Sequence, residues 1–295
     1  MKTKYLFLII AIIISACSNN NNKSDAYGNF EANAIMVSSE GNGKILSFKV
    51  EEGEILKAEE IVGLIDTVKL NLQKQQLLDT QKAIASKLEI ISAQIEVQKQ
   101  QKANLLIDKN RLEKLLKDGA ATQQQMDNIS GSLDLIEKQI FSIKTQKAGV
   151  FDEIQAVGKQ IEQVEVSLKN CYIKNPVSGT VLSKFVEQGE ITTFGKPLYK
   201  IADLTELKLK VYVSGAQLPN VKIGQKVEVL IDKNEKSNRK LKGEICWISE
   251  SAEFTPKTIQ TKKERVNLVY AIKVRVKNDG SLKIGMPGEI NLLRK

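Results

Sequence analysis

Two short segments of this chain repeat each other across a long stretch of unrelated sequence, and this split repeat constrains the fold strongly. GKILSFKVEEGEI, from Gly43 to Ile55, aligns with GTVLSKFVEQGEI, from Gly179 to Ile191, at a constant offset of 136 residues, and eight of the thirteen positions are identical. Each copy alternates apolar and polar residues, turns at Glu-x-Gly-Glu and continues into a second apolar run. The pattern predicts one strand, turn and strand on each side of the intervening residues.

A unit of this size cannot cover both faces of its own strands, so we expect the two copies to pack together as one small β-sandwich. The arrangement resembles the two halves of a lipoyl or biotinyl carrier domain, and it predicts a split lipoyl-like domain formed by residues 39–66 and 171–203. In carriers, a tight hairpin with a modified lysine joins the halves. Residues 67–170 stand in its place here, so no attached cofactor is expected.

Residues 67–170 have the pattern of a long α-helical hairpin. There is no proline from Thr67 to Lys169, and most of the dominant residue types are strong helix formers. In the second arm, apolar residues recur in the steps of three, four and seven that define a coiled-coil seam: Ile129, Leu133, Ile136, Ile140, Ile143, Val150, Ile154, Val157, Ile161, Val164 and Leu168. The first arm follows the rule more loosely: Leu70, Leu77, Ile84, Leu88, Ile91, Ile95, Leu105, Leu112 and Leu116, with polar residues near Gln98, Lys102 and Lys109. At 1.5 Å per residue each arm is about 75 Å long, which suits a spacer or a docking arm better than a catalytic core.

The segment RLEKLLKDGAAT, residues 111–122, interrupts this helical pattern and predicts the hairpin tip at 117–122. Gly119 suits the left-handed position just after a helix. Thr122, followed three residues later by Gln125, forms a capping-box pattern for the next helix. The tip is also more apolar than a solvated turn requires, through Leu115, Leu116, Ala120 and Ala121.

The N-terminus has the pattern of a targeting segment. Two lysines precede an apolar run from Leu6 to Ala16, which is shorter than the roughly 20 residues needed to span a bilayer and is typical of a signal peptide, residues 1–16. Ile14 to Cys17 resembles a lipobox, with Ile in place of the usual Leu, which implies lipidation of Cys17 and a flexible tether over residues 17–27. An uncleaved short anchor and an ordinary cleaved signal are the alternatives. All three place the folded part in the periplasm, and we expect it to be lipid-anchored to the inner membrane of a Gram-negative bacterium.

Composition excludes several kinds of chemistry. The chain has no histidine, which removes Ser/His/Asp and Cys/His catalysis and histidine-containing zinc sites. Its three cysteines are too few and too far apart for a metal cluster or a disulfide framework, and Cys171 and Cys246 are expected to be buried free thiols. The formal net charge is +9, but the lysines are scattered among Glu and Gln residues and do not cluster. This distribution favours proximity to an anionic membrane surface over binding of nucleic acid. We therefore predict a protein that is not an enzyme, with no catalytic residue, cofactor or metal.

The order of these segments resembles the periplasmic adaptor, or membrane fusion, proteins (HlyD-like family). The resemblance implies a mixed α and β, elongated and modular fold, in which a split lipoyl-like (barrel-sandwich hybrid) domain carries an antiparallel coiled-coil hairpin and a β-barrel follows. We expect the barrel in residues 204–295, with residues 28–38 as a further strand. The stretch from Thr255 to Leu292, which contains KIGMPGEI, resembles adaptors encoded with ABC-type transporters. Because the chain ends soon after that motif, we expect no extra membrane-proximal domain.

The resemblance also implies partners. In family members that work with trimeric outer-membrane channels, the hairpin tip resembles Arg-x3-Leu-x6-Ser/Thr, and Arg111, Leu115 and Thr122 have this spacing. It implies that these residues dock onto the channel, that copies of the chain form a ring, most often a hexamer, and that the inner-membrane partner is an ABC-type transporter rather than a proton-driven one. The alternatives are a structural coiled-coil lipoprotein of the envelope without a transport role and, less strongly favoured, a lipoyl or biotinyl carrier-like protein.

Overall fold

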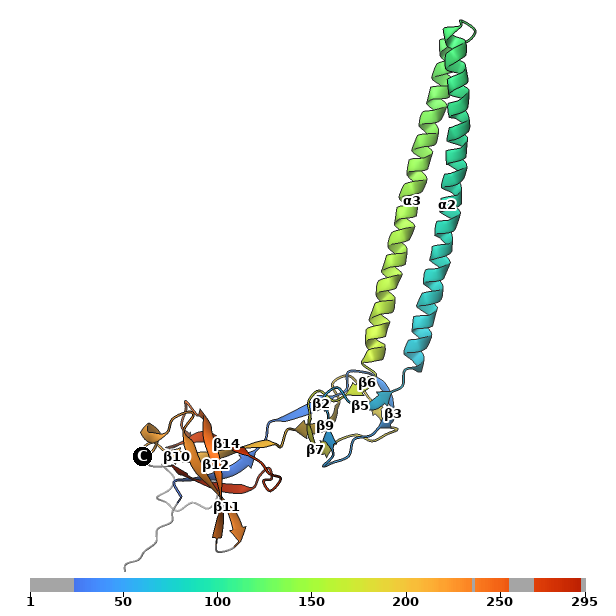
Figure 1. Cartoon of the computed structure of the whole chain (residues 1–295). Coiled ribbons are helices and arrows are strands. Elements are labelled where there is room, and N and C mark those ends of the chain that lie inside the picture. Colours follow the sequence, from blue (N-terminus) through green and yellow to red (C-terminus); the bar gives the residue numbers. More distant parts are fainter. Residues whose placement is uncertain (1–23, 235–236, 255–267, 293–295) are drawn as a thin grey trace, which may run out of the picture.

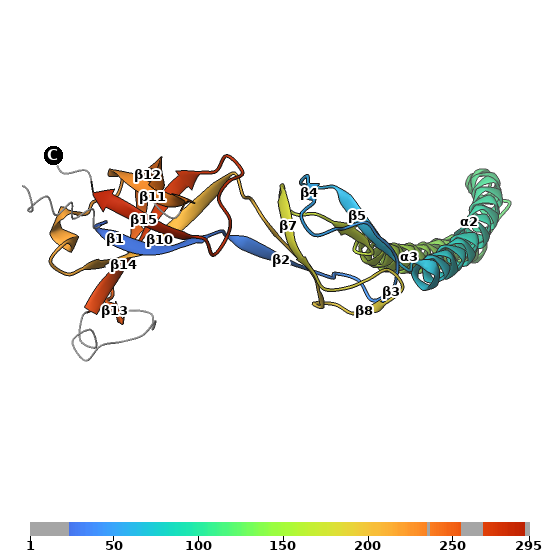
Figure 2. The same cartoon turned by 90° about the horizontal axis from the view of Figure 1, so that it is seen from below.

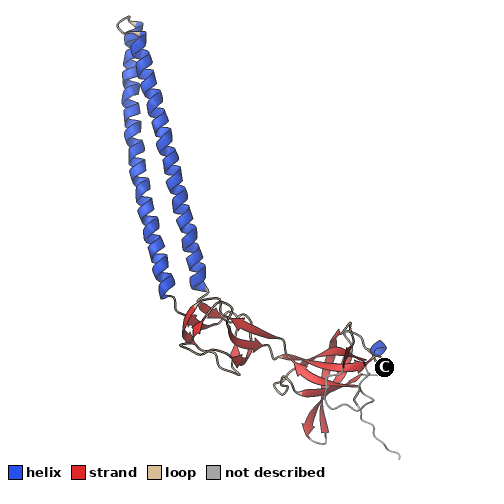
Figure 3. Ribbon diagram, turned by 180° about the vertical axis from the view of Figure 1, so that it is seen from behind, coloured by secondary structure: helices blue, strands red, loops and turns tan. Residues whose placement is uncertain are grey.

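The computed structural model describes residues 24–234, 237–254 and 268–292, and the signal segment and Cys17 lie outside these residues. Three parts follow one another along an elongated molecule: a β-barrel, a small β-sandwich and a long helical hairpin (Figure 1). This confirms the predicted fold class. Among the described residues, the helices lie in the hairpin apart from one short 3₁₀ helix in the barrel region (Figure 3).

Six antiparallel strands close the barrel in the order β10-β1-β15-β11-β12-β14, and β14 pairs again with β10. Their bounds are β1 Ala26–Glu31, β10 Glu206–Ser214, β11 Lys226–Asn234, β12 Ser237–Ile248, β14 Leu268–Lys277 and β15 Pro287–Leu292. The short strand β13, Glu253–Phe254, pairs with β14 at the side (Figure 2). The 3₁₀ helix η1, Leu218–Asn220, lies between β10 and β11.

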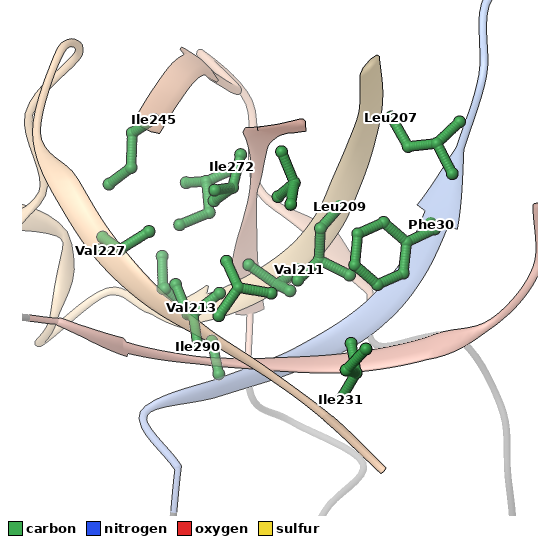
Figure 4. Packing of buried hydrophobic residues seen from close by; sticks show 14 of the residues in the cluster. Phe30, Leu207, Leu209, Val211, Val213, Val227, Ile231, Ile245, Ile272 and Ile290 are labelled. Atoms are coloured by element: carbon green, nitrogen blue, oxygen red, sulfur yellow. The ribbon is translucent and has the colours of Figure 1, made fainter. Parts of the chain in front are cut away.

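Alternation along the strands fills the barrel interior. In β10 every second residue, from Leu207 to Val213, is fully buried, and the residues between them are partly exposed. Side chains from the other strands meet them in one core, which includes Phe30, Ile272 and Ile290 (Figure 4). Period-two burial of this kind is expected when a sheet closes on itself and one face of every strand turns inward.

The two copies of the repeat form the β-sandwich by exchanging strands. One sheet has the order β2-β9-β7-β4 and the other β6-β5-β3-β8. The strands are β2 Ala34–Ser38, β3 Gly43–Phe48, β4 Ile55–Leu56, β5 Ile61–Ile65, β6 Tyr172–Lys174, β7 Gly179–Lys184, β8 Ile191–Thr192 and β9 Pro197–Ala202. Each sheet therefore takes two strands from each side of the hairpin, so neither half of the sandwich is complete without the other.

Hydrogen bonds repeat at the same offset of 136 residues. The amide of Gly189 donates to the carbonyl of Ile45 at 2.8 Å, and the amide of Gly53 donates to the carbonyl of Val181 at 2.9 Å. The strands β2 and β6, which lie outside the identical segments, also correspond at this offset. The sandwich is thus built with approximate two-fold symmetry, and the core that both halves share contains Ile45, Leu198 and Tyr199.

The structure differs from prediction at the N-terminal strand. Residues 28–38 do not form one barrel strand: β1 joins the barrel, and β2 pairs with β9 in the sandwich. The reason is burial on both sides of the break, because Phe30 is packed in the barrel core and Val37 in the sandwich core. The predicted tether 17–27 is also too long, since β1 begins at Ala26 and the Asp25 carboxylate accepts a hydrogen bond from the amide of Leu292 at 2.8 Å.

The hairpin consists of α2, Val68–Lys117, and α3, Gln123–Lys169. Each of the predicted seam residues in both arms is buried or half-buried, as a coiled-coil seam requires. Ion pairs across the seam, Lys102 with Glu137 and Lys74 with Glu165, each at 2.6 Å, set the register of the arms. Within the part of the chain that the structure describes, no helix has the length and apolar character needed to cross a membrane.

Candidate functional site: the hairpin tip

The end of α2 is closed by main-chain hydrogen bonds of a Schellman motif. The amide of Ala120 donates to the carbonyl of Leu115 at 2.8 Å, and the amide of Gly119 donates to the carbonyl of Leu116 at 3.1 Å. Gly119 has a φ of 72°, a left-handed conformation that costs other residues energy. The turn is therefore defined by its backbone and presents its side chains at a fixed position.

The start of α3 is closed by a capping box at Thr122. The hydroxyl oxygen of Thr122 accepts from the amide of Gln125 at 3.3 Å, and the amide of Thr122 donates to the Gln125 side-chain oxygen at 2.9 Å. The Thr122 hydroxyl also contacts that same oxygen at 3.2 Å. The Thr122 side chain therefore holds the direction of α3 while it stays exposed to solvent.

Arg111 and Leu115 lie one helical turn apart, so they share a face of α2. Arg111 is exposed, and its guanidinium lies 3.6 Å from the Asp108 carboxylate one turn earlier. Leu115 is 41% exposed, whereas its neighbour Leu116 is half-buried in the seam. The Leu115 side chain is thus not part of the seam that holds the two arms together, and it is available to contact another molecule.

The structure adds Asp108 to the residues predicted from the sequence. An exposed ion pair of this kind contributes little to stability, but it restrains the long Arg111 side chain on the face that Leu115 occupies. The sequence carried a signal for Asp108, because an acidic residue three positions before an arginine on a helix can form an ion pair with it. Arg111, Leu115 and Thr122 all lie at the end of the hairpin farthest from the barrel (Figure 1).

The described chain begins at the opposite end of the molecule. β1 runs from the far end of the barrel toward the sandwich, so the chain enters the barrel at its end away from the hairpin (Figure 1). The Ser24 hydroxyl donates to the Glu289 carboxylate there. The start of the described chain and the predicted docking residues therefore lie on parts of the molecule that are separated by the sandwich and the length of the hairpin.

The two described cysteines lie apart, one in each β-structure. Cys171 is a buried free thiol, as predicted, and burial raises its pKa, with a smaller effect from the Asp66 carboxylate. Cys246 is only half-buried, which differs from the prediction, and its thiol contacts the Lys273 carbonyl at 3.3 Å. Over residues 24–234, 237–254 and 268–292, no group of three or more acidic or cysteine side chains is arranged to hold a metal ion.

Comparison with known proteins identifies relatives along most of the chain. Residues 203–293 match the family described as "LcnD-like, C-terminal domain". A UPF0194 membrane protein of Yersinia enterocolitica is 24% identical over 91% of this chain and 89% of its own length. A UPF0194 membrane protein of Acidithiobacillus ferridurans is 23% identical over 90% of this chain and 86% of its own length.

Solved structures share the fold. MacA from Actinobacillus actinomycetemcomitans has a TM-score of 0.57 at 22% identity, over 90% of this chain and 76% of its own. The membrane fusion protein Spr0693 from Streptococcus pneumoniae R6 has a TM-score of 0.54 at 15% identity, over 91% of this chain and 98% of its own. Together with the matched C-terminal domain and the full-length relatives, these structures confirm the resemblance: the chain has the fold of the periplasmic adaptor, or membrane fusion, proteins.

Proposed function

We propose that this chain is a periplasmic adaptor subunit that links an inner-membrane transporter to an outer-membrane channel in a tripartite export system. The observation that carries the proposal is the position of the exposed tip, which two helices of 50 and 47 residues hold far from the barrel (Figure 1). At 1.5 Å per residue the hairpin alone spans about 70 to 75 Å. A stiff element of this length suits a protein that bridges two distant partners, and its adaptor role needs no catalytic site.

The barrel end is proposed to lie at the inner membrane. With Cys17 lipidated, six residues separate the anchor from Ser24, and a chain of that length extends at most roughly 25 Å. The relatives from Yersinia and Acidithiobacillus are described as membrane proteins, which supports a membrane-associated chain. We assign the inner-membrane partner to the ABC type rather than the proton-driven type, because of the resemblance of the C-terminal sequence.

The tip is proposed to dock onto a trimeric outer-membrane channel. Arg111 offers an exposed guanidinium with several fixed donors, and Leu115 offers an apolar side chain beside it. Thr122 contributes mainly by fixing the geometry, since its hydroxyl is already used in the capping box. A ring of copies, a hexamer by family resemblance, would present several such tips to the channel at once, and simultaneous contacts would strengthen the weak contact of each one.

Site-specific photocrosslinking tests the docking. We expect a photoreactive amino acid at Ala120, which is exposed at the tip, to crosslink to an outer-membrane channel that mass spectrometry identifies. The same probe at Thr80, exposed low on α2, serves as the control and should give no such product. A tip that crosslinks only to peptidoglycan or other envelope components would instead support the structural lipoprotein.

Substitution of the three tip residues separates docking from folding. Arg111→Ala, Leu115→Ala and Thr122→Asp in one chain should abolish the Ala120 crosslink while helicity stays unchanged, because Asp also caps helix N-termini. The matched control carries Leu72→Ala and Lys87→Ala, two exposed changes on the same helix away from the tip, and should crosslink normally. Full crosslinking by the tip variant would contradict the assignment of these residues.

A further inference from the structure

Exposed apolar side chains lie along both sides of the hairpin, outside the seam that joins α2 and α3. One set, here called the aromatic flank, consists of Phe141, Phe151 and Leu106, which are 71%, 53% and 41% exposed. The other, the aliphatic flank, consists of Ile90, Val97 and Leu135, which are 60%, 57% and 59% exposed. These six lie in the middle of the hairpin. The other exposed large apolar residues of the two helices are Val68, Leu72, Leu78 and Val166 near the base, Ile107 on the face opposite the seam, and Leu115 near the tip. Single exposed apolar residues are common, so the question is how the six in the middle are arranged.

The two sets lie on opposite sides of the hairpin. Counted from the seam residues as heptad positions a and d, the aromatic flank occupies positions b and e, and the aliphatic flank occupies position c. On a helix with this period, b and e lie on one side of the seam and c and g on the other. In an antiparallel pair, the e positions of both helices share one side and the g positions share the other, so each set combines residues from α2 and α3 on one side.

The two sets also lie at matching heights along the hairpin. The numbers of each ion-paired couple, Lys102 with Glu137 and Lys74 with Glu165, total 239, so residue n of α2 lies level with residue 239 − n of α3. Phe151 is then level with residue 88, near Ile90; Phe141 is level with 98, beside Val97; and Leu135 is level with 104, near Leu106. Each difference is at most two residues, or about 3 Å along the axis.

We propose that the aromatic flank of one copy packs against the aliphatic flank of the next copy, with the hairpins side by side and level. The proposal rests on the adaptor function above and specifies which surfaces of this chain meet in its assembly. Contact between two different faces of the same molecule repeats from copy to copy, and it closes into a ring when the rotation between copies allows. The matching heights single out a second copy as the occupant, because an unrelated partner would not require two complementary faces on one hairpin.

The charges of the two sides agree with this packing. Positions b and e of the two helices carry a small acidic excess once Glu137 and Glu165, which are paired with Lys102 and Lys74 within the hairpin, are set aside: Glu89, Glu96, Glu113, Asp127, Asp134 and Glu162 against Lys82, Lys99, Lys117, Lys144 and Lys169. Positions c and g carry a small basic excess: Lys69, Lys87 and Arg111 against Asp108 and Glu153. Opposite net charge favours the contact between unlike sides over the contact between like sides.

Cysteine crosslinking in the full-length lipoprotein tests the inference. The background carries Cys171→Ser and Cys246→Ser and keeps Cys17 for the anchor. A chain with Phe141→Cys and Val97→Cys, treated in membranes with a short bismaleimide, should form a ladder of dimers, trimers and larger products. When the two changes are on separate, differently tagged chains, only mixed dimers should form.

A level-matched control uses Gln100→Cys and Lys138→Cys, exposed residues that point away from the seam, and it should give no ladder. Phe141→Glu with Phe151→Glu, in a chain that carries the cysteines at Leu106 and Leu135, should abolish that second crosslink with helicity retained. Dimers from Phe141→Cys alone would show contact between like faces and overturn the inference, as would a ladder no stronger than the control.

A variant of the tip separates this inference from the proposed function. Leu115→Ala with Thr122→Asp should leave the side-by-side ladder intact, because these two residues lie above the paired levels and carry none of the charges counted above. A ladder without any channel crosslink at Ala120 would refute the proposed docking and keep the packing. A channel crosslink without the ladder would refute the packing and keep the docking.

Discussion

At the scale of single residues, the repeat in the sandwich allows one position to be compared with its counterpart in the same molecule. Glu59 has a φ of 63°, the positive-φ conformation that glycine adopts readily, and its counterpart 136 residues later is Gly195, with a φ of 81°. The two amides make equivalent bonds, from Glu59 to the Asn175 carbonyl at 2.7 Å and from Gly195 to the Ser39 carbonyl at 2.8 Å. The fold therefore demands the conformation at both sites, and only one site has the residue that suits it.

Exchange of residues between these sites should shift stability in opposite directions. Glu59→Gly should stabilise the sandwich by about 0.5 to 1 kcal/mol, because the removed strain exceeds the added chain entropy and the exposed ion pair with Lys174 contributes little. Gly195→Glu should destabilise it by a similar amount, about 0.5 to 1 kcal/mol, because the added strain exceeds the chain entropy that glycine loses on folding. The measurement is the shift of the denaturant unfolding midpoint, and a destabilising Glu59→Gly would show that the side chain has a contribution beyond its conformation.

At the scale of elements, the sequence predicted those features that depend on local periodicity. The seam of α3, the left-handed Gly119 and the capping box at Thr122 follow from spacing alone, and the structure has them as predicted. The division of residues 28–38 into β1 and β2 could not be predicted, because an alternating pattern indicates a strand without indicating its partner sheet. The outward faces of the hairpin were missed for a related reason, since the seam pattern does not indicate what the remaining apolar residues contact.

Acid should weaken the hairpin in a way that depends on its two interhelical ion pairs. Hydrogen bonds from Lys102 and Lys74, followed by the charges of these lysines, hold the pKa values of Glu137 and Glu165 below their ordinary value of 4.5. A carboxylate whose pKa is lower in the folded state stabilises that state above its unfolded pKa, and the contribution is lost as pH falls through the folded value. We therefore expect the melting temperature of the helical signal at 222 nm to fall as pH drops below about 4.5.

Paired variants isolate this contribution. Glu137→Gln with Glu165→Gln should lower the melting temperature at neutral pH and show a smaller further loss in acid. Glu89→Gln with Glu153→Gln, two exposed carboxylates outside both interhelical pairs, should keep the acid dependence of the unmodified chain. Equal acid dependence in both variants would assign the effect to the general charge of the hairpin and not to the two pairs.

At the scale of the whole molecule, the length of the hairpin links the tip to the barrel. The sandwich at its base takes strands from both sides of the insert, so α2 starts from the same core to which α3 returns (Figure 2). The heptad seam continues through both arms, and the ion pairs fix their register from base to upper half. A stiff hairpin of this kind fixes the distance between the tip and the sandwich. If a partner binds at each end, the length of the hairpin has to match the distance between the two partners.

Removal of one heptad from each arm tests this requirement directly. Deletion of residues 77–83 together with 156–162 removes level segments, joins equivalent heptad positions and leaves both ion pairs and both flanks in place. The hairpin should fold with unchanged helicity per residue and be about 10 Å shorter. If the adaptor spans a fixed distance, the Ala120 probe should lose its crosslink to the channel, and an unrelated pair of heptads at the same sites should restore it.

Deletion of 77–83 alone serves as the control for register, since it should disrupt the seam and lower helicity. An undiminished crosslink from the evenly shortened hairpin would mean that the distance between the partners adjusts to the adaptor. The hairpin would then provide the contact with the channel without determining how far apart the partners lie.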